Sequence, residues 1–148
     1  MSARTILAMG GDGFQMEPDN RLLDDHVLRL ARERSGRNWP RILLIPTATG
    51  DDAGLIADFE RLFAPPRTEP RVLHLFTRAD DELVAVVGEQ DAVHVHGDNT
   101  ANLLALWRLY HGEAQRRPLY RRGAWRVEPR VASRSFETAL ATRYLGAS

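Results

Sequence analysis

Short apolar runs alternate along the chain with longer segments of helical spacing, and this alternation limits the possible folds more than any other feature. Four apolar runs, at residues 5–9, 42–45, 72–76 and 92–95, are bounded by turn or charged residues. They are spaced too far apart for hairpins and are expected to be buried strands. Because strands that alternate with helices form parallel sheets, the pattern predicts a doubly wound α/β fold, with a mostly parallel sheet flanked by helices.

Helix signals lie between the expected strands. Apolar residues at helical spacing follow the polar pairs at 19–20 and 51–52, whose side chains are of the type that caps helices. A shorter helix is expected over residues 81–87, and a fourth from residue 99 or 100 to about residue 110. The pattern therefore predicts a helix after each of the four expected strands.

Composition narrows the function classes. The chain has 148 residues, 43% of them hydrophobic, which predicts a single domain spanning residues 1–148. Twenty basic residues balance twenty acidic ones, so no field favours nucleic acid or an anionic membrane, and neither is expected as a partner. The apolar run near the N-terminus is too short for a signal sequence or a membrane span, and a cytoplasmic location is expected.

Two residue types are missing, and each excludes a chemistry. The chain has no cysteine, which rules out disulfides, thiolate metal sites and a cysteine nucleophile. All twenty basic residues are arginines, so a P-loop lysine, a Schiff-base lysine and a Ser-Lys dyad are impossible.

Polar turns containing glycine follow three of the expected strands, at residues 10–13, 46–51 and 96–100. In open α/β sheets, ligands bind at the carboxyl ends of the strands, where backbone N–H groups can face a carboxylate or an oxyanion. The alternative is that glycine and asparagine simply permit tight turns there. Taken together, the three turns leave both interpretations open.

Several motifs together closely resemble the peptidase E family, serine dipeptidases that also include cyanophycinase. The resemblance covers residues 4 to about 112, and residues 124–128 and 142–146 resemble the C-terminal edge of that family. The motifs are Met-Gly-Gly-Asp-Gly-Phe-Gln-Met-Glu-Pro-Asp-Asn at 9–20, Leu-Leu-Asp-Asp at 22–25, Ile-Pro-Thr-Ala-Thr-Gly at 45–50, and Gly-Asp-Asn-Thr-Ala-Asn-Leu-Leu at 97–104 with Trp107.

This resemblance implies a fold like that of class I glutamine amidotransferases, which is flavodoxin-like. It also implies hydrolysis of dipeptides with an N-terminal aspartate, or of related aspartyl amides, by acyl transfer without a cofactor. The implied partner is a small peptide or aspartyl substrate. Candidates for the oxyanion loop or the substrate pocket are Gly10, Gly11, Gly97, Asp98, Asn99 and Thr100.

Two positions in the turn at residues 96–100 depart from the family. His96 and Asp98 stand where the family has glycine, and a carboxylate beside a developing oxyanion is repulsive. Any such position that needs a positive φ angle would be strained for His or Asp. Asn99 and Thr100 match the family, and capping the next helix is expected to be their main role.

No catalytic residue can be identified. None of the serines lies in a Gly-x-Ser-x-Gly setting after an apolar strand, the sharp turn that exposes such a nucleophile; they are Ser2, Ser35, Ser133, Ser135 and Ser148. The family's nucleophile segment should follow Gly112, and a further segment should separate Arg122 from Gly123. The apparent deletions at 112/113 and 122/123 would remove the nucleophile, its base and central strands of the sheet.

Three origins for these deletions stay open: residues omitted from the sequence, a naturally deleted paralogue, or a disrupted reading frame. Three functions also stay open. The chain is a serine dipeptidase whose catalytic centre is not shown, a non-catalytic binding protein or pseudoenzyme that keeps the pocket rim, or a remnant that forms a homo-oligomer at a shortened sheet edge.

The fourth strand carries two histidines on one face, His94 and His96, which could ligate a metal. No third ligand is evident, so packed or solvated histidines are favoured and no metal is expected.

Overall fold

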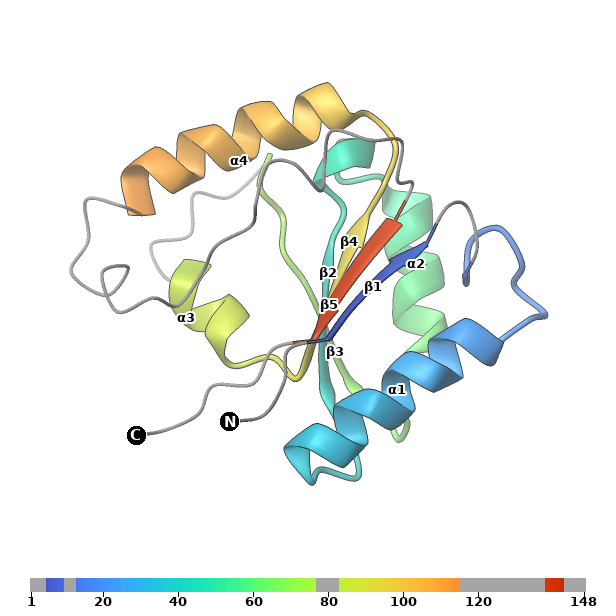
Figure 1. Ribbon diagram of the computed structural model, residues 1–148. Helices are drawn as coiled ribbons and strands as arrows, with labels where there is room; N and C mark the ends of the chain where they lie inside the picture. Colours follow the sequence, from blue (N-terminus) through green and yellow to red (C-terminus); the bar gives the residue numbers. More distant parts are fainter. Residues whose placement is uncertain (1–4, 10–12, 77–82, 115–137, 143–148) are drawn as a thin grey trace.

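The computed structural model describes residues 5–9, 13–76, 83–114 and 138–142, which form one sheet with helices on both faces (Figure 1). Its strands are β1 (Thr5–Met9), β2 (Arg41–Ile45), β3 (Glu69–Val72), β4 (Ala92–His96) and β5 (Thr138–Thr142). Its helices are α1 (Leu22–Ser35), α2 (Ala53–Leu62), α3 (Leu83–Gly88) and α4 (Thr100–Ala114), with a short 3₁₀ turn, η1 (Thr47–Thr49), after β2.

The strands lie in the order β1-β5-β4-β2-β3. β2 runs parallel to both β3 and β4, while β5 is antiparallel to both of its neighbours, β4 and β1. All strands except β5 therefore point the same way, which confirms the predicted α/β fold with a mostly parallel sheet. β5 was not predicted from the sequence; it lies between β1 and β4 in the sheet.

The third strand is shorter and earlier than predicted. It was expected at residues 72–76, whereas β3 is Glu69–Val72, paired in register with β2 from Arg41 to Leu44. After the strand ends, the N–H of Leu73 still donates to the carbonyl of Leu44 at 2.9 Å. Leu73 and Leu75 are buried in the same cluster as Val87 of α3. Their apolar character reflects that burial and not membership of a strand.

Side chains that alternate along β2 and β4 build a core on each face of the sheet. On one face, Ile42, Leu44 and Ala92 pack with α1 and α2, in a cluster that also contains Phe14, Val27, Leu28, Ala31, Leu55, Phe59 and Phe63. On the other face, the cluster comprises Leu43, Ile45, Val93 and Val95 with Ala48, Leu73, Leu75, Val87 and Leu103. Figure 1 shows α1 and α2 on one side of the sheet and α3 and α4 on the other.

The helix cap predicted from the sequence is present at α2 and differs at α1. The Asp52 side chain accepts a hydrogen bond from the Leu55 N–H at 2.8 Å and caps α2, as predicted. α1 begins after Arg21, whose side chain makes no capping hydrogen bond, and the Asn20 side chain accepts from the N–H of Leu22, the first helical residue, at 3.3 Å. Among the described residues, no helix is both long and apolar enough to cross a membrane.

One of the two apparent deletions, at 112/113, falls within α4. α4 continues through Gly112 and Glu113 to Ala114, four residues beyond its expected end. The junction between Arg122 and Gly123 lies outside the described residues.

α1 carries a buried carboxyl group in its first turn. Asp24 is only 4% exposed, and its Oδ2 atom has no hydrogen-bond partner. The pKa of Asp24 is raised to about 6, mainly by burial and also by the neighbouring Asp25, while Arg67 and Arg21 act in the opposite direction. The folded protein therefore favours the protonated form of this side chain.

We expect the Asp24→Asn variant to be more stable than the parent near neutral pH. The raised pKa means that Asp24 costs no stability below about pH 4 and progressively more as the pH rises to 6. Urea denaturation should show a gain on the order of 1–2 kcal/mol at pH 7 that disappears near pH 4. Asp19→Asn, at an exposed position outside the helix, is the control. A loss of stability in Asp24→Asn that is equal at both pH values would contradict this account.

Candidate functional site

The parallel strands β1, β2 and β4 end at the same edge of the sheet, and their following turns meet there. The N–H of Asn99, after β4, donates to the carbonyl of Ala48, after β2, at 3.2 Å. Phe14, after β1, lies against His96 at the end of β4, with ring centroids 6.3 Å apart. We call residues 13–14, 46–51 and 96–100 the carboxyl rim. The candidates Gly10 and Gly11 lie outside the described residues.

The turn after β2 is held by its own backbone. The N–H groups of Thr49 and Asp51 and the Thr49 hydroxyl all donate to the carbonyl of Pro46, and the Gly50 N–H donates to the Thr47 carbonyl. Gly50 and Asp51 have φ angles of 71° and 60°, the left-handed conformation that a turn of this tightness requires.

Asp51 connects this turn to the chain beyond β3. Its carboxylate, 6% exposed, accepts from the Phe76 N–H at 3.2 Å and lies 3.7 Å from Nδ1 of His74. From the sequence, Asp51 was grouped with Asp52 as a helix cap, and this contact was not predicted. No local signal identifies it, because the partners are more than twenty residues away along the chain.

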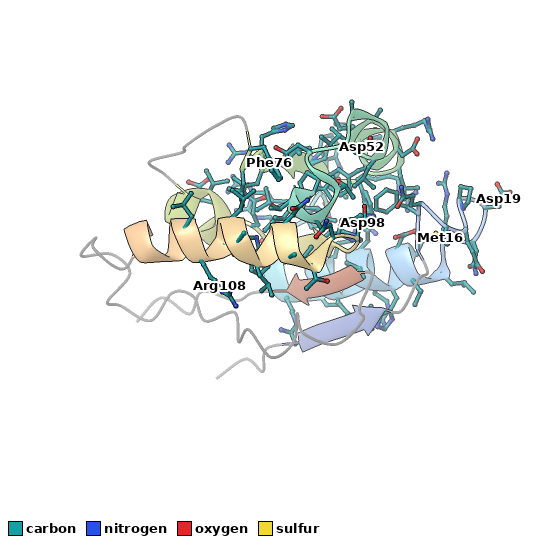
Figure 2. All side chains as sticks on the ribbon, turned by 90° about the horizontal axis from the view of Figure 1, so that it is seen from above. Met16, Asp19, Asp52, Phe76, Asp98 and Arg108 are labelled. Atoms are coloured by element: carbon teal, nitrogen blue, oxygen red, sulfur yellow. The ribbon has the colours of Figure 1, made fainter. Side chains whose placement is uncertain are left out.

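The turn after β4 contains the other candidates. Gly97 is buried, and Asp98 is exposed at the N-terminal end of α4 (Figure 2). Asn99 caps α4, because its Oδ1 accepts from the Asn102 N–H at 3.1 Å, which confirms the capping role. Thr100 is the first residue of the helix and not its cap.

Asp98 has a φ angle of 134°, a conformation that favours glycine. The expected strain at this position is therefore present. The backbone keeps the geometry of a glycine turn although the side chain is a carboxylate.

We expect Asp98→Gly to raise the free energy of unfolding by about 1 kcal/mol, because it relieves the unfavourable φ angle. Asp98→Ala is the matched control: it removes the charge but keeps the strain. Chemical denaturation of both variants separates the two effects. A stability for the glycine variant no higher than that of the alanine variant would argue against backbone strain.

The two histidines of β4 are packed in the interior beneath the rim. Their rings stack with centroids 5.9 Å apart, as their predicted position on one face requires, and Phe14 lies 5.4 Å from His94. Neither ring nitrogen of His94 has a hydrogen-bond partner. Burial lowers the pKa of His94 to about 3, and His96 contributes to the same shift. His94 is thus a neutral, packed side chain.

In the part of the chain that the structure describes, no three His, Asp or Glu side chains come together as a metal site.

We expect His94→Leu to remove a pH dependence of stability. Because the folded-state pKa lies below the ordinary 6.5, His94 costs nothing above that pH and destabilises the fold as the pH falls towards 3. Between pH 7 and pH 5 the parent should lose about 2 kcal/mol through this residue, and the variant should not. The exposed His26, replaced by Gln, serves as control. Parallel pH profiles for parent and His94→Leu would disprove the assignment.

Hydroxyl nucleophiles are poorly placed in the described residues. Ser35 is the one serine among them, and its Oγ donates to the Ala31 carbonyl at 2.7 Å. Its neighbour Arg34 donates to Thr5, the first residue of β1, which places Ser35 near the amino edge of the sheet. The other serines, Ser2, Ser133, Ser135 and Ser148, lie outside the described residues.

Two rim threonines also lack the environment of a nucleophile. Thr47 is fully buried and its Oγ1 has no hydrogen-bond partner, while the Thr49 hydroxyl is bound to the Pro46 carbonyl. A serine-type mechanism needs a base within hydrogen-bond reach of the hydroxyl. Neither threonine meets that requirement.

The fold and the rim define a doubly wound α/β protein whose candidate site lies at the strand ends and at a helix N-terminus. The chain belongs to peptidase family S51, whose family model matches residues 6–122. The resemblance to the peptidase E family is thereby confirmed.

One relative is considerably longer than this chain. Over 105 residues the chain is 44% identical to a protein named uncharacterized peptidase YgaJ, from Bacillus subtilis (strain 168). The match covers 71% of this chain but 44% of the relative, so the chain spans less than half of that protein's length. No solved structure matches the chain.

Proposed function

We propose that this chain binds short peptides with an N-terminal aspartate, or related aspartyl amides, at the carboxyl rim, and that it does not cleave them by itself. The observation that carries the proposal is the Asn99–Ala48 hydrogen bond, which holds two family-matching turns together at one edge. Membership of a peptidase family supports a peptide as the ligand.

The N-terminus of α4 supplies the binding groups. The first N–H groups of a helix have no partner within it, and the Asn99 side chain satisfies the one at Asn102. The N–H groups of Thr100 and Ala101 are therefore available to a ligand carbonyl or carboxylate oxygen, which the helix dipole also attracts.

Asp98 weighs against hydrolysis at this rim. Its exposed carboxylate is adjacent to Asn99 and Thr100, where an oxyanion would develop during acyl transfer. Catalysis depends on donors aimed at that developing charge, and a nearby negative charge opposes it. A neutral peptide carbonyl in the ground state is affected less.

A serine-type dipeptidase is the second candidate, and the family match favours it. In that reaction a serine hydroxyl attacks the peptide carbonyl while a base accepts its proton, and the base passes this proton to the amine that leaves as the peptide C–N bond breaks. Water then attacks the acyl-serine, which releases the carboxylic acid and restores the serine hydroxyl. The serine and the base would have to come from residues outside those described. Labelling by a serine-directed reagent distinguishes this candidate from the first.

We expect the dipeptide Asp-Ala to bind saturably in calorimetry, without release of free aspartate and without labelling by a fluorophosphonate. Thr100→Pro removes one N–H at the first helical position, where proline is tolerated, and should weaken binding about tenfold or more. Ala53→Pro, at the corresponding position of α2, is the control and should bind as the parent does.

Two results would overturn the proposal. Serine labelling together with Asp-Ala hydrolysis would establish the dipeptidase instead. Absence of binding at millimolar Asp-Ala, or equal loss in both proline variants, would remove the α4 N-terminus as the site.

A further inference from the structure

His74 differs from the other histidines whose side chains the structure describes in what its ring faces. Its Nδ1 atom lies 3.7 Å from Oδ2 of Asp51, and its side chain is 41% exposed, whereas that of Asp51 is 6% exposed. The ring therefore has a buried carboxylate next to one nitrogen and stands partly in solvent. His26 instead faces a cation, because its Nδ1 lies 2.9 Å from the Arg29 guanidinium. The two histidines of β4 are buried.

Backbone contacts hold both members of the Asp51–His74 pair in place. Leu73 and Leu75, on either side of His74, are buried, and the Leu73 N–H donates to a carbonyl of β2 at 2.9 Å. Asp51 ends the hydrogen-bonded turn after β2, and its Oδ2 also accepts from the Phe76 N–H at 3.2 Å. The carboxylate and the imidazole thus keep their relative positions through the chain on each side of them.

This arrangement determines which ring nitrogen can react. A carboxylate that faces Nδ1 favours the tautomer with the proton on that nitrogen, so the lone pair is on Nε2, the nitrogen farther from Asp51. The same carboxylate stabilises the cationic ring that forms when Nε2 bonds to an electrophile. Such contacts are often longer than a hydrogen bond in an unliganded protein and shorten in the complex. At His26 the guanidinium requires Nδ1 to be the acceptor, which leaves the proton on Nε2.

We propose that His74 is a nucleophile that accepts acyl groups from activated esters, and that Asp51 is its positioning residue. Nε2 bonds to the acyl carbon while the ester C–O bond breaks, and the alkoxide or aryloxide leaves with the electron pair. Water then attacks the acyl carbon, the acyl–Nε2 bond breaks, and the carboxylic acid is released. The proton that water loses passes to the departed oxyanion, and the neutral imidazole is restored.

This activity is separate from peptide binding at the start of α4. An amide has an amine as its leaving group, which an imidazole does not displace, so Asp-Ala stays intact. The composition of the chain also favours His74 as the reactive group. No lysine or cysteine is present, so the side-chain amines and thiols that compete for acylating reagents are missing.

The first test uses the parent protein, so it does not depend on the folding of a variant. Diethyl pyrocarbonate, applied at pH 8 where imidazole side chains are neutral, should modify His74 faster than His26, as mapped by mass spectrometry. ¹⁵N NMR at the same pH should show the ring proton of His74 on Nδ1. Modification of His26 at an equal or higher rate, or a ring proton on Nε2 of His74, would overturn the proposal.

The second test measures hydrolysis of p-nitrophenyl acetate. The rate should fall about tenfold or more in His74→Gln and stay unchanged in His26→Gln. Asp51→Asn should lower it about tenfold, because the charge beside Nδ1 is lost. Asparagine tolerates the left-handed φ angle of residue 51 and can still accept from the Phe76 N–H, so this variant keeps the turn. An unchanged rate in His74→Gln would remove the nucleophile, and an unchanged rate in Asp51→Asn would remove its positioning residue.

Discussion

Two hydrogen-bonded ladders formed by β5 connect β1 to the rest of the sheet. β5 pairs with β1 along all of Thr5–Met9 and with β4 from Val93 to His96, and among the described strands β1 pairs with no other. Without β5, β1 would lose its strand partner among the described residues, and β4 would keep only its pairing with β2. Because β5 runs in the opposite direction, its first residue, Thr138, lies between Met9 and His96 at the carboxyl rim.

The rim that this sheet supports is built from backbone and packing contacts. Asn99 joins the turn after β4 to the turn after β2, Asp51 joins that turn to Phe76, and Phe14 covers His96. The same region contains a strained φ angle at Asp98, and a neutral buried histidine lies beneath it. Local choices that cost stability are typical of functional sites. The strained Asp98 and the buried His94 lie near the backbone N–H donors at the start of α4. Among the described residues, no hydroxyl nucleophile lies within hydrogen-bond reach of a base.

What the sequence could predict depends on the range of the interactions. The α/β class follows from periodicity, and the caps at Asp52 and Asn99 follow from neighbours three residues away, so local patterns sufficed. β5 is Thr-Ala-Leu-Ala-Thr, whose small residues lack a strong strand pattern, and its pairing partners are distant in the chain. The Asp51–Phe76 contact and the Phe14–His96 contact are also long-range. The family was recognisable because its motifs are local, whereas the tertiary contacts were not.

The orientation of β5 can be measured directly by NMR. In antiparallel strands, facing residues of non-hydrogen-bonded pairs bring their Cα atoms to about 4.5 Å, close enough for strong Hα–Hα Overhauser effects, which parallel strands do not give. We expect such effects between alternate facing residues of β5 and β4, among pairs such as His94 with Leu140, and likewise between β5 and β1. Absence of Hα–Hα effects on either side of residues 138–142, or a pattern typical of parallel pairing, would contradict the sheet on which this account of the rim depends.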